Sequence, residues 1–213
     1  LDMFHKAEQL SDAMQRNIKD ALLEDLGSGD LSARFLLDKR VEAHVLLKST
    51  NAILCGASWF ENTVRFVDKA TKVKWKKTDG LKIFQGELIC ILCGRARSIL
   101  AAERAGLNFL QTLSATATLT HNYIERIKDA NKEGCIIFDT RKTLPGLRLA
   151  QKYAVRVGGG KNQRFGLWDG VLLKENHLMS IGGLSKLIGR YGNASNAADV
   201  EHINFNHLQI EVE

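Results

Sequence analysis

Three short apolar segments in the second half of the chain, each with charged residues at its end, restrict the fold most. They are CIIFD (135–139), GVLLKE (170–175) and HLQIEVE (207–213), and they begin about 35 residues apart. This spacing is close to the ~31 residues per strand–helix unit of an eight-fold α/β barrel of ~250 residues. Between the first two, residues 146–158 place apolar side chains on one helical face and end in glycine. The repeat therefore predicts successive parallel strand–helix units.

Three such strands are fewer than the eight that close a barrel, and the chain stops on the last of them. We therefore expect an incomplete TIM-like α/β barrel over residues 113–213. The rest of the barrel is expected to be truncated or missing from this sequence.

The first half of the chain has a different pattern, typical of an α+β arrangement. Residues 10–26 repeat apolar side chains at a spacing of four, which predicts a helix that Gly27 can end. Short β-like runs follow between residues 41 and 94: VEAHVLLKS, the alternating KVKWKK and the apolar LICILC. We expect residues 1–112 to form an N-terminal α/β sandwich domain, with a helix on a mainly antiparallel sheet.

Residues 97–128 favour a helix through their Ala, Leu, Glu and Arg content. Their middle is rich in threonine, which has a lower helix propensity. We therefore expect a break in this helix near Ser114–Thr118.

Composition and charge narrow the classes of function. The chain has 213 residues and a net charge of +6, and no run approaches the ~18 apolar residues of a membrane helix. The N-terminus has no basic start followed by an apolar block, so we expect no secretion signal and no membrane partner. Lys and Arg are scattered, with residues 72–77 as the only dense cluster, which argues against nucleic-acid binding. Positive charge also suits an enzyme of phosphorylated or carboxylated substrates.

The four cysteines include a C-x-x-C pair, Cys90 and Cys93, which could serve redox or zinc chemistry. A zinc site needs a second pair of ligands at suitable spacing, and none is visible. The pair lies in an apolar, strand-like run, so we interpret both as structural thiols of a protein from the reducing cytoplasm.

Charged residues lie at the carboxyl ends of the three predicted strands. In parallel α/β barrels these ends meet at one face, where the active site lies, so the charges are expected to converge there. The alternative is a set of ordinary loop charges, because strand ends are often polar. The residues concerned are Asp139, Arg141, Lys142, Lys174, Glu175 and Glu213.

Several of these residue types suit a polyanionic small molecule. Arg141 offers a planar fork for a carboxylate or phosphate, and Lys142 beside it is a compact charge suited to phosphate. Gly158–Gly160 precede a second arginine, Arg164. These glycines either let the backbone approach a ligand closely or simply form a turn that ends a helix. His177 could act as an acid or base, although a lone histidine is more often structural.

The stretch DTRKTLPGLRLAQKYAVRVGGGKNQRFGLWDGVLLKENH (139–177) resembles the quinolinate phosphoribosyltransferases of NAD biosynthesis. That family reads D-T-R-K-T-x-P-G-x-R, then K-Y-A-V, then G-G-G-x-x-H-R, then a strand ending in K-[DE]-N-H. ALLEDLGSGDLS (21–32), ILAAERAGLNFLQTLSATATLT (99–120) and IEVE (210–213) resemble other segments of the family. The resemblance spans almost the whole chain.

The resemblance implies a glycosyltransferase of the pentosyltransferase type. Such an enzyme transfers phosphoribosyl from phosphoribosyl pyrophosphate to quinolinate, with Mg²⁺ present. The products are nicotinate mononucleotide, pyrophosphate and CO₂. The family forms homodimers, and hexamers also occur.

The resemblance also implies a set of residues around quinolinate. Arg141 and Arg164 would bind its carboxylates with help from Lys174. Arg104 would reach the same substrate from the neighbouring subunit of a dimer.

Other matched positions would face the second substrate or depart from the family. Lys142 would contact phosphates, and Glu213 would face the ribose and its Mg²⁺. Gln163 stands where the family has histidine, and it can still donate a hydrogen bond to a carboxylate. The residues expected to be catalytic are Lys142, Lys174 and Glu213.

Two alternatives stay open from the sequence. A related protein of molybdate-transport gene clusters shares much of this architecture, but Arg104, Arg141 and Arg164 favour the dicarboxylate enzyme. A nucleic-acid-binding protein would explain the positive charge and leave the charges at the strand ends unexplained. The later aspartate strand and glycine-rich phosphate loops of the family are not among these residues, which bears on whether this chain completes the reaction.

Overall fold

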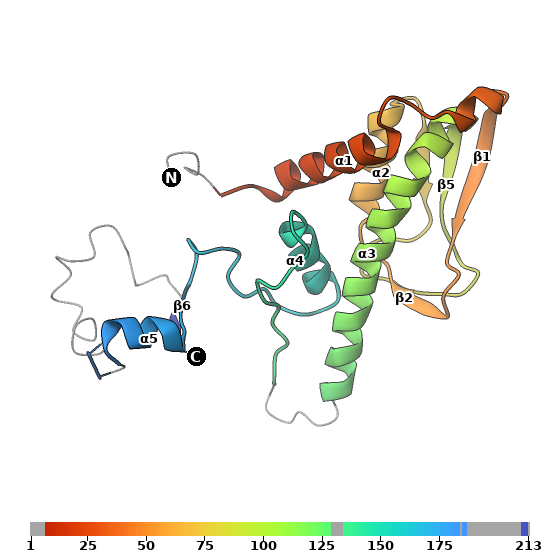
Figure 1. Cartoon of the computed structure of the whole chain (residues 1–213). Coiled ribbons are helices and arrows are strands. Elements are labelled where there is room, and N and C mark those ends of the chain that lie inside the picture. The colour runs from red at the N-terminus through yellow and green to blue at the C-terminus, as the bar shows by residue number, and fades with distance from the viewer. Residues whose placement is uncertain (1–6, 129–133, 184, 187–209, 213) are drawn as a thin grey trace. The chain divides into compact units, whose positions relative to one another are not determined.

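The structure is a computed structural model that describes residues 7–128, 134–183, 185–186 and 210–212. The chain forms two compact units, Leu1–Gln163 and Arg164–Glu213 (Figure 1).

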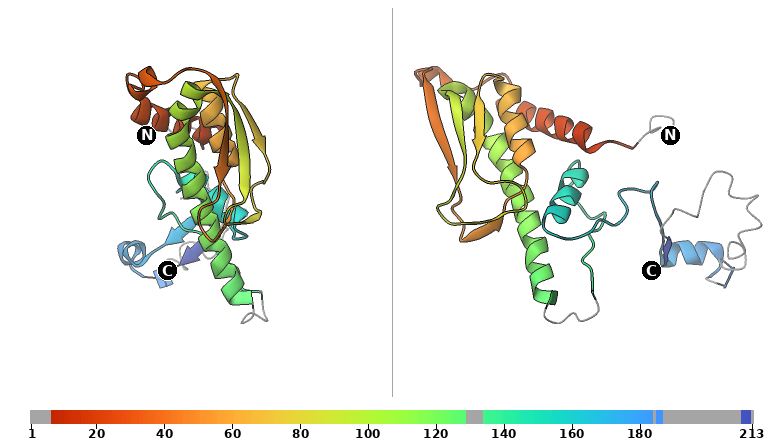
Figure 2. Two further views of the ribbon diagram at one scale, coloured as in Figure 1. Left: turned by 90° about the vertical axis from the view of Figure 1, so that its right-hand side faces the viewer. Right: turned by 180° about the vertical axis from the view of Figure 1, so that it is seen from behind.

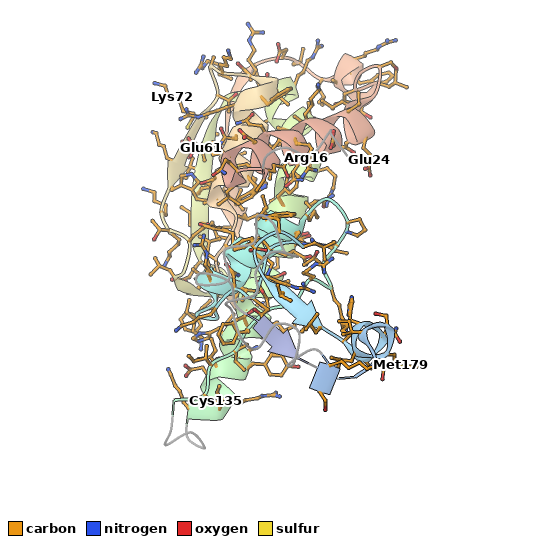
Figure 3. All side chains as sticks on the ribbon, turned by 90° about the vertical axis from the view of Figure 1, so that its left-hand side faces the viewer. Arg16, Glu24, Glu61, Lys72, Cys135 and Met179 are labelled. Atoms are coloured by element: carbon orange, nitrogen blue, oxygen red, sulfur yellow. The ribbon has the colours of Figure 1, made fainter. Side chains whose placement is uncertain are left out.

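The first unit contains two antiparallel sheets. Strands β1 (Arg40–Leu46), β5 (Leu88–Arg95) and β3 (Lys72–Trp75) form one sheet in the order β1-β5-β3. Strands β2 (Asn51–Ile53) and β4 (Lys82–Phe84) form the other. These sheets confirm the antiparallel arrangement predicted from the β-like runs. The alternation in β3 is also confirmed, because its lysines are exposed and Lys72 points away from the helices (Figure 3).

Helices complete the first unit as further layers beside the three-stranded sheet. Helix α2 (Ala57–Val67) packs against α3 (Ala96–Lys128), and α1 (Leu10–Leu26) and α4 (Arg148–Val157) contact both α3 and each other. Figure 2 shows the sheet on one side of α2 and α3, and α1 on the other. A short 3₁₀ helix, η1 (Ser32–Phe35), leads from α1 to the sheet. The predicted helix at residues 10–26 is confirmed, and it ends at Gly27, whose φ is +49°.

Two clusters of buried apolar side chains hold these layers together. The first lies between the sheet and helices α2 and α3, and includes Phe60, Ile89 and Leu110. The second joins α1, α2, α3 and α4, and includes Ile18, Trp59 and Ala154. Helix α3 contributes to both clusters, so it positions the loops around α4 relative to the sheet.

The expected break in the long helix is wrong, because α3 runs without interruption through Ser114–Thr118. The hydroxyl groups that lower helix propensity have partners here. Ser114 Oγ accepts from the backbone N–H of Cys55 (2.9 Å) and donates to its carbonyl (3.0 Å). Thr118 Oγ1 accepts from the N–H of Ile53 (2.8 Å) and donates to the carbonyl of Ser114 (2.6 Å). These bonds to β2 and to the residues after it stabilise the helix where its propensity is lowest.

Replacing Ser114 by alanine is expected to lower the free energy of unfolding by roughly 1–3 kcal/mol, because the buried backbone groups of Cys55 lose their partner. Urea denaturation measures this change. Thr116→Ala is the matched control, since Thr116 Oγ1 donates only to Thr112 within the same helix. Its effect should stay below about 0.5 kcal/mol. Equal losses in both variants would contradict this role for Ser114.

The second unit confirms one parallel pair of the predicted barrel. Strand β6 (Val171–Leu173) pairs in parallel with β7 (Ile210–Val212), and the short helix α5 (Glu175–Ile181) follows β6. The expected strand at 135–139 is reduced to a single parallel bridge between Phe138 and Lys161, in the first unit. The turn after α4 brings only residues 161–163 alongside it, which is too short for a ladder.

The remaining structural expectations concern cysteines and membrane helices. Cys90 is fully buried, and its burial raises its thiol pKa to about 12, which fits a structural thiol. None of the described cysteines forms a disulfide. Among the described helices, none has the length and apolar character needed to cross a membrane.

Candidate functional site

The candidate site is built around residues 139–147, here called the 139–147 loop, which leads into α4. The only proline of the chain gives this loop a tight turn. Pro145 and Gly146 occupy the middle of the turn, Gly146 has a φ of +76°, and the N–H of Leu147 donates to the carbonyl of Leu144 (3.1 Å). Proline followed by a residue of positive φ is typical of a type II turn, which requires glycine at the second position.

Helix α1 holds this turn in place from outside. Nδ2 of Asn17, a nearly buried side chain of α1, donates to the carbonyl of Gly146 (2.9 Å). Arg16, labelled in Figure 3, donates to the same carbonyl (3.3 Å). The end of the loop is therefore fixed by two side chains from the N-terminal helix.

One face of α4 holds the middle of the loop. Arg148 donates to Thr143 Oγ1 (3.3 Å) and to the carbonyl of Arg141 (3.4 Å). Gln151, almost one turn further along α4, accepts from the N–H of Leu144 (2.7 Å). Residues three to four positions apart share a helix face, which explains why both reach the same loop.

The opposite side of α4 packs into the body of the unit. Ala150 and Ala154 are fully buried against α3 and its neighbours. Tyr153 contacts the ring of Trp59 and donates from its hydroxyl to Asp79 Oδ2 (2.9 Å). Burial and then the nearby Asp79 charge raise the pKa of Tyr153 above its usual value, so the hydroxyl keeps its proton and its bond.

A buried ion pair holds the start of the loop. Lys152 of α4 donates to Asp139 Oδ1, and the two side chains are 0% and 7% exposed. Asp139 Oδ2 accepts from Nδ2 of Asn162 (2.6 Å), and Oδ1 also accepts from the N–H of Gln163 (2.8 Å). Lys152 donates in addition to the carbonyl of Gln163 (2.8 Å). An ion pair, a side-chain amide and backbone groups thus connect the loop to α4 and to residues 162–163.

The glycines after α4 make a helix-ending turn that packs closely on α3. A Cβ atom on Gly158 would lie 2.4 Å from the carbonyl oxygen of Ala117, and one on Gly160 would lie 2.8 Å from Val155 Cγ1. Gly159 has a φ of +94°. Of the two interpretations left open for these glycines, the structure supports the turn, and their small size brings residues 161–163 beside residues 137–139.

The first unit contains four of the predicted site residues. Arg141 is half-buried and Lys142 is exposed, both on the 139–147 loop, and Gln163 is half-buried beside Asp139. Arg104 is exposed on α3 and lines a groove of about 670 Å³ between α3 and β1. The structure therefore brings Gln163 together with the start of the loop, and it places Arg104 in a separate groove.

The second unit contains the other predicted residues that the structure describes. Arg164 donates to the carbonyl of Gly170 (3.1 Å) and is half-buried. Lys174 caps α5, and its N–H donates to Nδ1 of His177 (3.0 Å), which gives that histidine a structural role. Glu175 is exposed in the first turn of α5. The expected substrate and metal contact Glu213 lies outside the described residues.

Sequence reasoning assigned no role to Arg148, Gln151, Lys152 and Asn162, which hold the loop. The spacing of charged residues on a helix usually indicates a solvent-exposed face, so Lys152 gave no sign of burial. Arg148 and Lys152 do occupy fixed letters of the quoted patterns, the last R of D-T-R-K-T-x-P-G-x-R and the K of K-Y-A-V. Those letters were the available signal.

Family models match both parts of the chain. The N-terminal domain of quinolinate phosphoribosyl transferase matches residues 30–114, and the C-terminal domain of the same enzyme matches residues 116–213. Together these models cover most of the sequence.

Named relatives agree with the family models. The chain is 38% identical over 172 residues to a probable nicotinate-nucleotide pyrophosphorylase [carboxylating] of Bacillus subtilis, covering 80% of this chain and 58% of that protein. It is 41% identical over 199 residues to a quinolinate phosphoribosyltransferase [decarboxylating] of Nicotiana tabacum, covering 92% and 53%. The chain thus spans about half the length of the curated relatives it matches.

A solved structure is similar over nearly the whole chain. The nicotinate-nucleotide pyrophosphorylase of Francisella tularensis superposes with a TM-score of 0.84 at 37% identity, covering 97% of this chain and 70% of that one. This likeness extends the agreement from sequence patterns to the course of the backbone. The chain therefore belongs to the quinolinate phosphoribosyl transferase family.

Proposed function

We propose that the protein transfers phosphoribosyl from phosphoribosyl pyrophosphate to quinolinate and releases CO₂, giving nicotinate mononucleotide and pyrophosphate. Family membership supports this reaction. The observation that carries it is the 139–147 loop, whose start, middle and end are each held by other elements while it presents Arg141 and Lys142. Cationic groups held in this way bind an anion without first losing side-chain and loop freedom.

The proposed contacts to quinolinate are those that the family resemblance implies. Arg141 and Arg164 would each bind a carboxylate through the guanidinium fork. Lys174 would add a third positive charge, and the amide of Gln163 would donate one hydrogen bond. Lys142, which is exposed at the loop, would contact the phosphates of the second substrate.

The reaction requires mainly that the two substrates are positioned and that their charges are stabilised. The ring nitrogen of quinolinate forms a bond to the sugar carbon while the bond to pyrophosphate breaks, and the electron pair leaves with pyrophosphate. The ring then carries a positive charge, so it accepts the electron pair of the carbon–carbon bond when CO₂ leaves, and a proton replaces the carboxylate. Cations around the two anions hold the reacting atoms together, and Glu213 would face the developing positive charge at the sugar.

We expect magnesium to bind together with phosphoribosyl pyrophosphate. The described residues include no group of three or more His, Cys, Asp or Glu side chains that could hold a metal ion. Asp139, the carboxylate at the start of the loop, has both oxygens engaged by Lys152, Asn162 and Gln163. We therefore assign the ion to the bound diphosphate and to Glu213.

Assembly and compartment are part of the same proposal. The exposed position of Arg104 on α3 supports its donation to the site of a second subunit in a homodimer, with hexamers as a larger form. The described cysteines, none of them in a disulfide, support a reducing compartment such as the cytoplasm.

Replacing Gln163 by histidine is expected to retain activity and to add a pH-dependent step. An imidazole has a pKa of ~6.5 and titrates near neutrality, whereas the amide of glutamine has no proton to gain. The pH dependence of kcat/KM between about pH 5.5 and pH 8 measures the difference. Identical profiles for the two proteins would count against a contact between residue 163 and the substrate.

The direct test of the function is an assay of the purified protein. Quinolinate, phosphoribosyl pyrophosphate and Mg²⁺ are supplied, and nicotinate mononucleotide is followed by chromatography. Product formation that requires both substrates supports the proposal. Binding of a different anion with no turnover of quinolinate would favour the relative from molybdate-transport clusters.

A further inference from the structure

Lys152 is the feature of the first unit that the proposed reaction leaves without a role. Its side chain is completely buried, although lysine is almost never fully buried unless it is paired. Removing two charges from water is costly, and well-packed apolar side chains of similar volume often serve stability equally well. Stability alone therefore does not explain why a buried lysine–aspartate pair is present here.

The contacts of Lys152 join two separate backbone segments. One bond reaches Asp139, the residue directly before Thr140, Arg141 and Lys142. The other reaches the backbone carbonyl of Gln163. Lys152 thus connects the 139–147 loop, which carries Arg141 and Lys142, to Gln163, the residue in place of the family's histidine.

The neighbouring hydrogen bonds fix the geometry of this connection. Asn162 donates to Asp139 Oδ2 (2.6 Å) and to the carbonyl of Lys152 (2.9 Å). The backbone N–H of Gln163 donates to Asp139, and the carbonyl of Gln163 accepts from Lys152. The backbone adds parallel bonds from Asp139 N–H to Lys161 (3.1 Å) and from Lys161 N–H to Ile137 (2.8 Å). A carboxylate held from several directions cannot turn without breaking several bonds at once.

We propose that Lys152, with Asp139, is a positioning residue that sets the distance between Arg141 and Gln163, and that this distance selects a pyridine with two adjacent carboxylates. The inference rests on the proposed function. Lys152 does not touch the substrate, because its side chain has no exposed surface. It acts through the two segments that it joins, and both carry groups assigned to quinolinate.

This role predicts a loss of selectivity for the diacid. A ligand with two carboxylates gains from a second contact only when the two protein groups stand at the right separation, and losing one hydrogen bond to a charged group costs ~10-fold to ~100-fold in affinity. A ligand with one carboxylate, such as nicotinate, needs only one of the contacts. When Lys152 is removed, the affinity for quinolinate should fall far more than the affinity for nicotinate.

The test uses Lys152→Met in the full natural protein, with calorimetric titration of quinolinate and of nicotinate. Methionine keeps most of the length of lysine and removes its charge. We expect Kd for quinolinate to rise between about 10-fold and about 100-fold, and Kd for nicotinate to change less than about 3-fold. Lys19→Met, at an exposed position of α1, is the matched control and should change neither value.

A second variant separates positioning from folding. Lys152→Met leaves the carboxylate of Asp139 without its charge partner and is expected to lower the melting temperature. The double variant Asp139→Asn/Lys152→Met removes that buried charge, so it should regain much of the melting temperature. The bond to Gln163 is still missing, and the preference for quinolinate should stay reduced.

The outcomes distinguish this inference from the function on which it rests. Failure of the unmodified protein to bind quinolinate would overturn the proposed function and this inference with it. An unmodified protein that binds quinolinate, together with folded variants of unchanged preference, would overturn the positioning role alone. A preference restored together with the melting temperature in the double variant would also overturn it, because stability would then explain the whole effect.

Discussion

Replacing Arg141 by alanine is expected to weaken quinolinate binding by roughly 2–5 kcal/mol, which is about 30-fold to several thousand-fold in Kd. Arg141 is half-buried on a loop that α1 and α4 hold, so in the proposed complex its guanidinium would meet the carboxylate with little loss of freedom. Its removal would take away two parallel charged hydrogen bonds and leave the bound carboxylate without that partner. Calorimetric titration of quinolinate measures the change.

Two further variants check that the effect comes from Arg141 itself. Arg126→Ala removes an equal charge from an exposed position in the last turn of α3 and should leave the affinity for quinolinate unchanged. Arg141→Lys keeps the charge and loses the planar fork of the guanidinium. Its affinity for quinolinate should therefore lie between the affinities of Arg141→Ala and Arg126→Ala. An unaltered affinity of Arg141→Ala would refute the assigned contact.

Replacing Gly158 by alanine is expected to lower the free energy of unfolding by about 3 kcal/mol or more. The added Cβ would lie 2.4 Å from the carbonyl oxygen of Ala117 and 2.8 Å from Cβ of Thr120. Both neighbours belong to α3, and a helix backbone cannot move aside locally, so the turn after α4 must move away from α3. Chemical denaturation measures the loss.

Gly86→Ala is the control for the backbone part of this effect. Gly86 has a φ of +81° and open space where its Cβ would lie, so alanine there costs only the strain of a positive φ, about 1–2 kcal/mol. A loss at Gly158 no greater than the loss at Gly86 would show that the close packing on α3 matters little. Because the same turn brings Gln163 beside Asp139, Gly158→Ala should also weaken quinolinate binding.

Local patterns in the sequence predicted the parts of the fold that depend on local rules. The apolar spacing of residues 10–26 gave the bounds of α1, and the alternation of KVKWKK gave the exposed lysines of β3. Periodicity succeeds there because one face of each element packs on the core and the other faces water.

Tertiary contacts decided the parts that the sequence did not predict. The threonine-rich middle of α3 stays helical because Ser114 and Thr118 bond to residues 53 and 55, which are distant in sequence. The expected strand at 135–139 forms one bridge, because few residues lie alongside it within the first unit. Neither outcome has a local signature.

The candidate site shows the same division. Arg141 and Lys142 were predicted from their place at a strand end and from their chemistry, and Gln163 from the letters of a family pattern. The structure places all three around the 139–147 loop and its partner segment. The groups that hold this arrangement, above all Lys152, were missed because a lysine on a short helix is usually solvated. Burial of a charged side chain depends on what packs around it, which one sequence does not reveal.

A crystal structure of the full natural protein with quinolinate bound would test the central claim most directly. We expect a carboxylate of quinolinate within about 3 Å of the guanidinium nitrogens of Arg141, with the side chain of Gln163 facing the same molecule. Lys152 should stay buried on Asp139 and make no contact with the ligand. Quinolinate bound elsewhere, with the side chain of Arg141 directed away from it, would contradict the account.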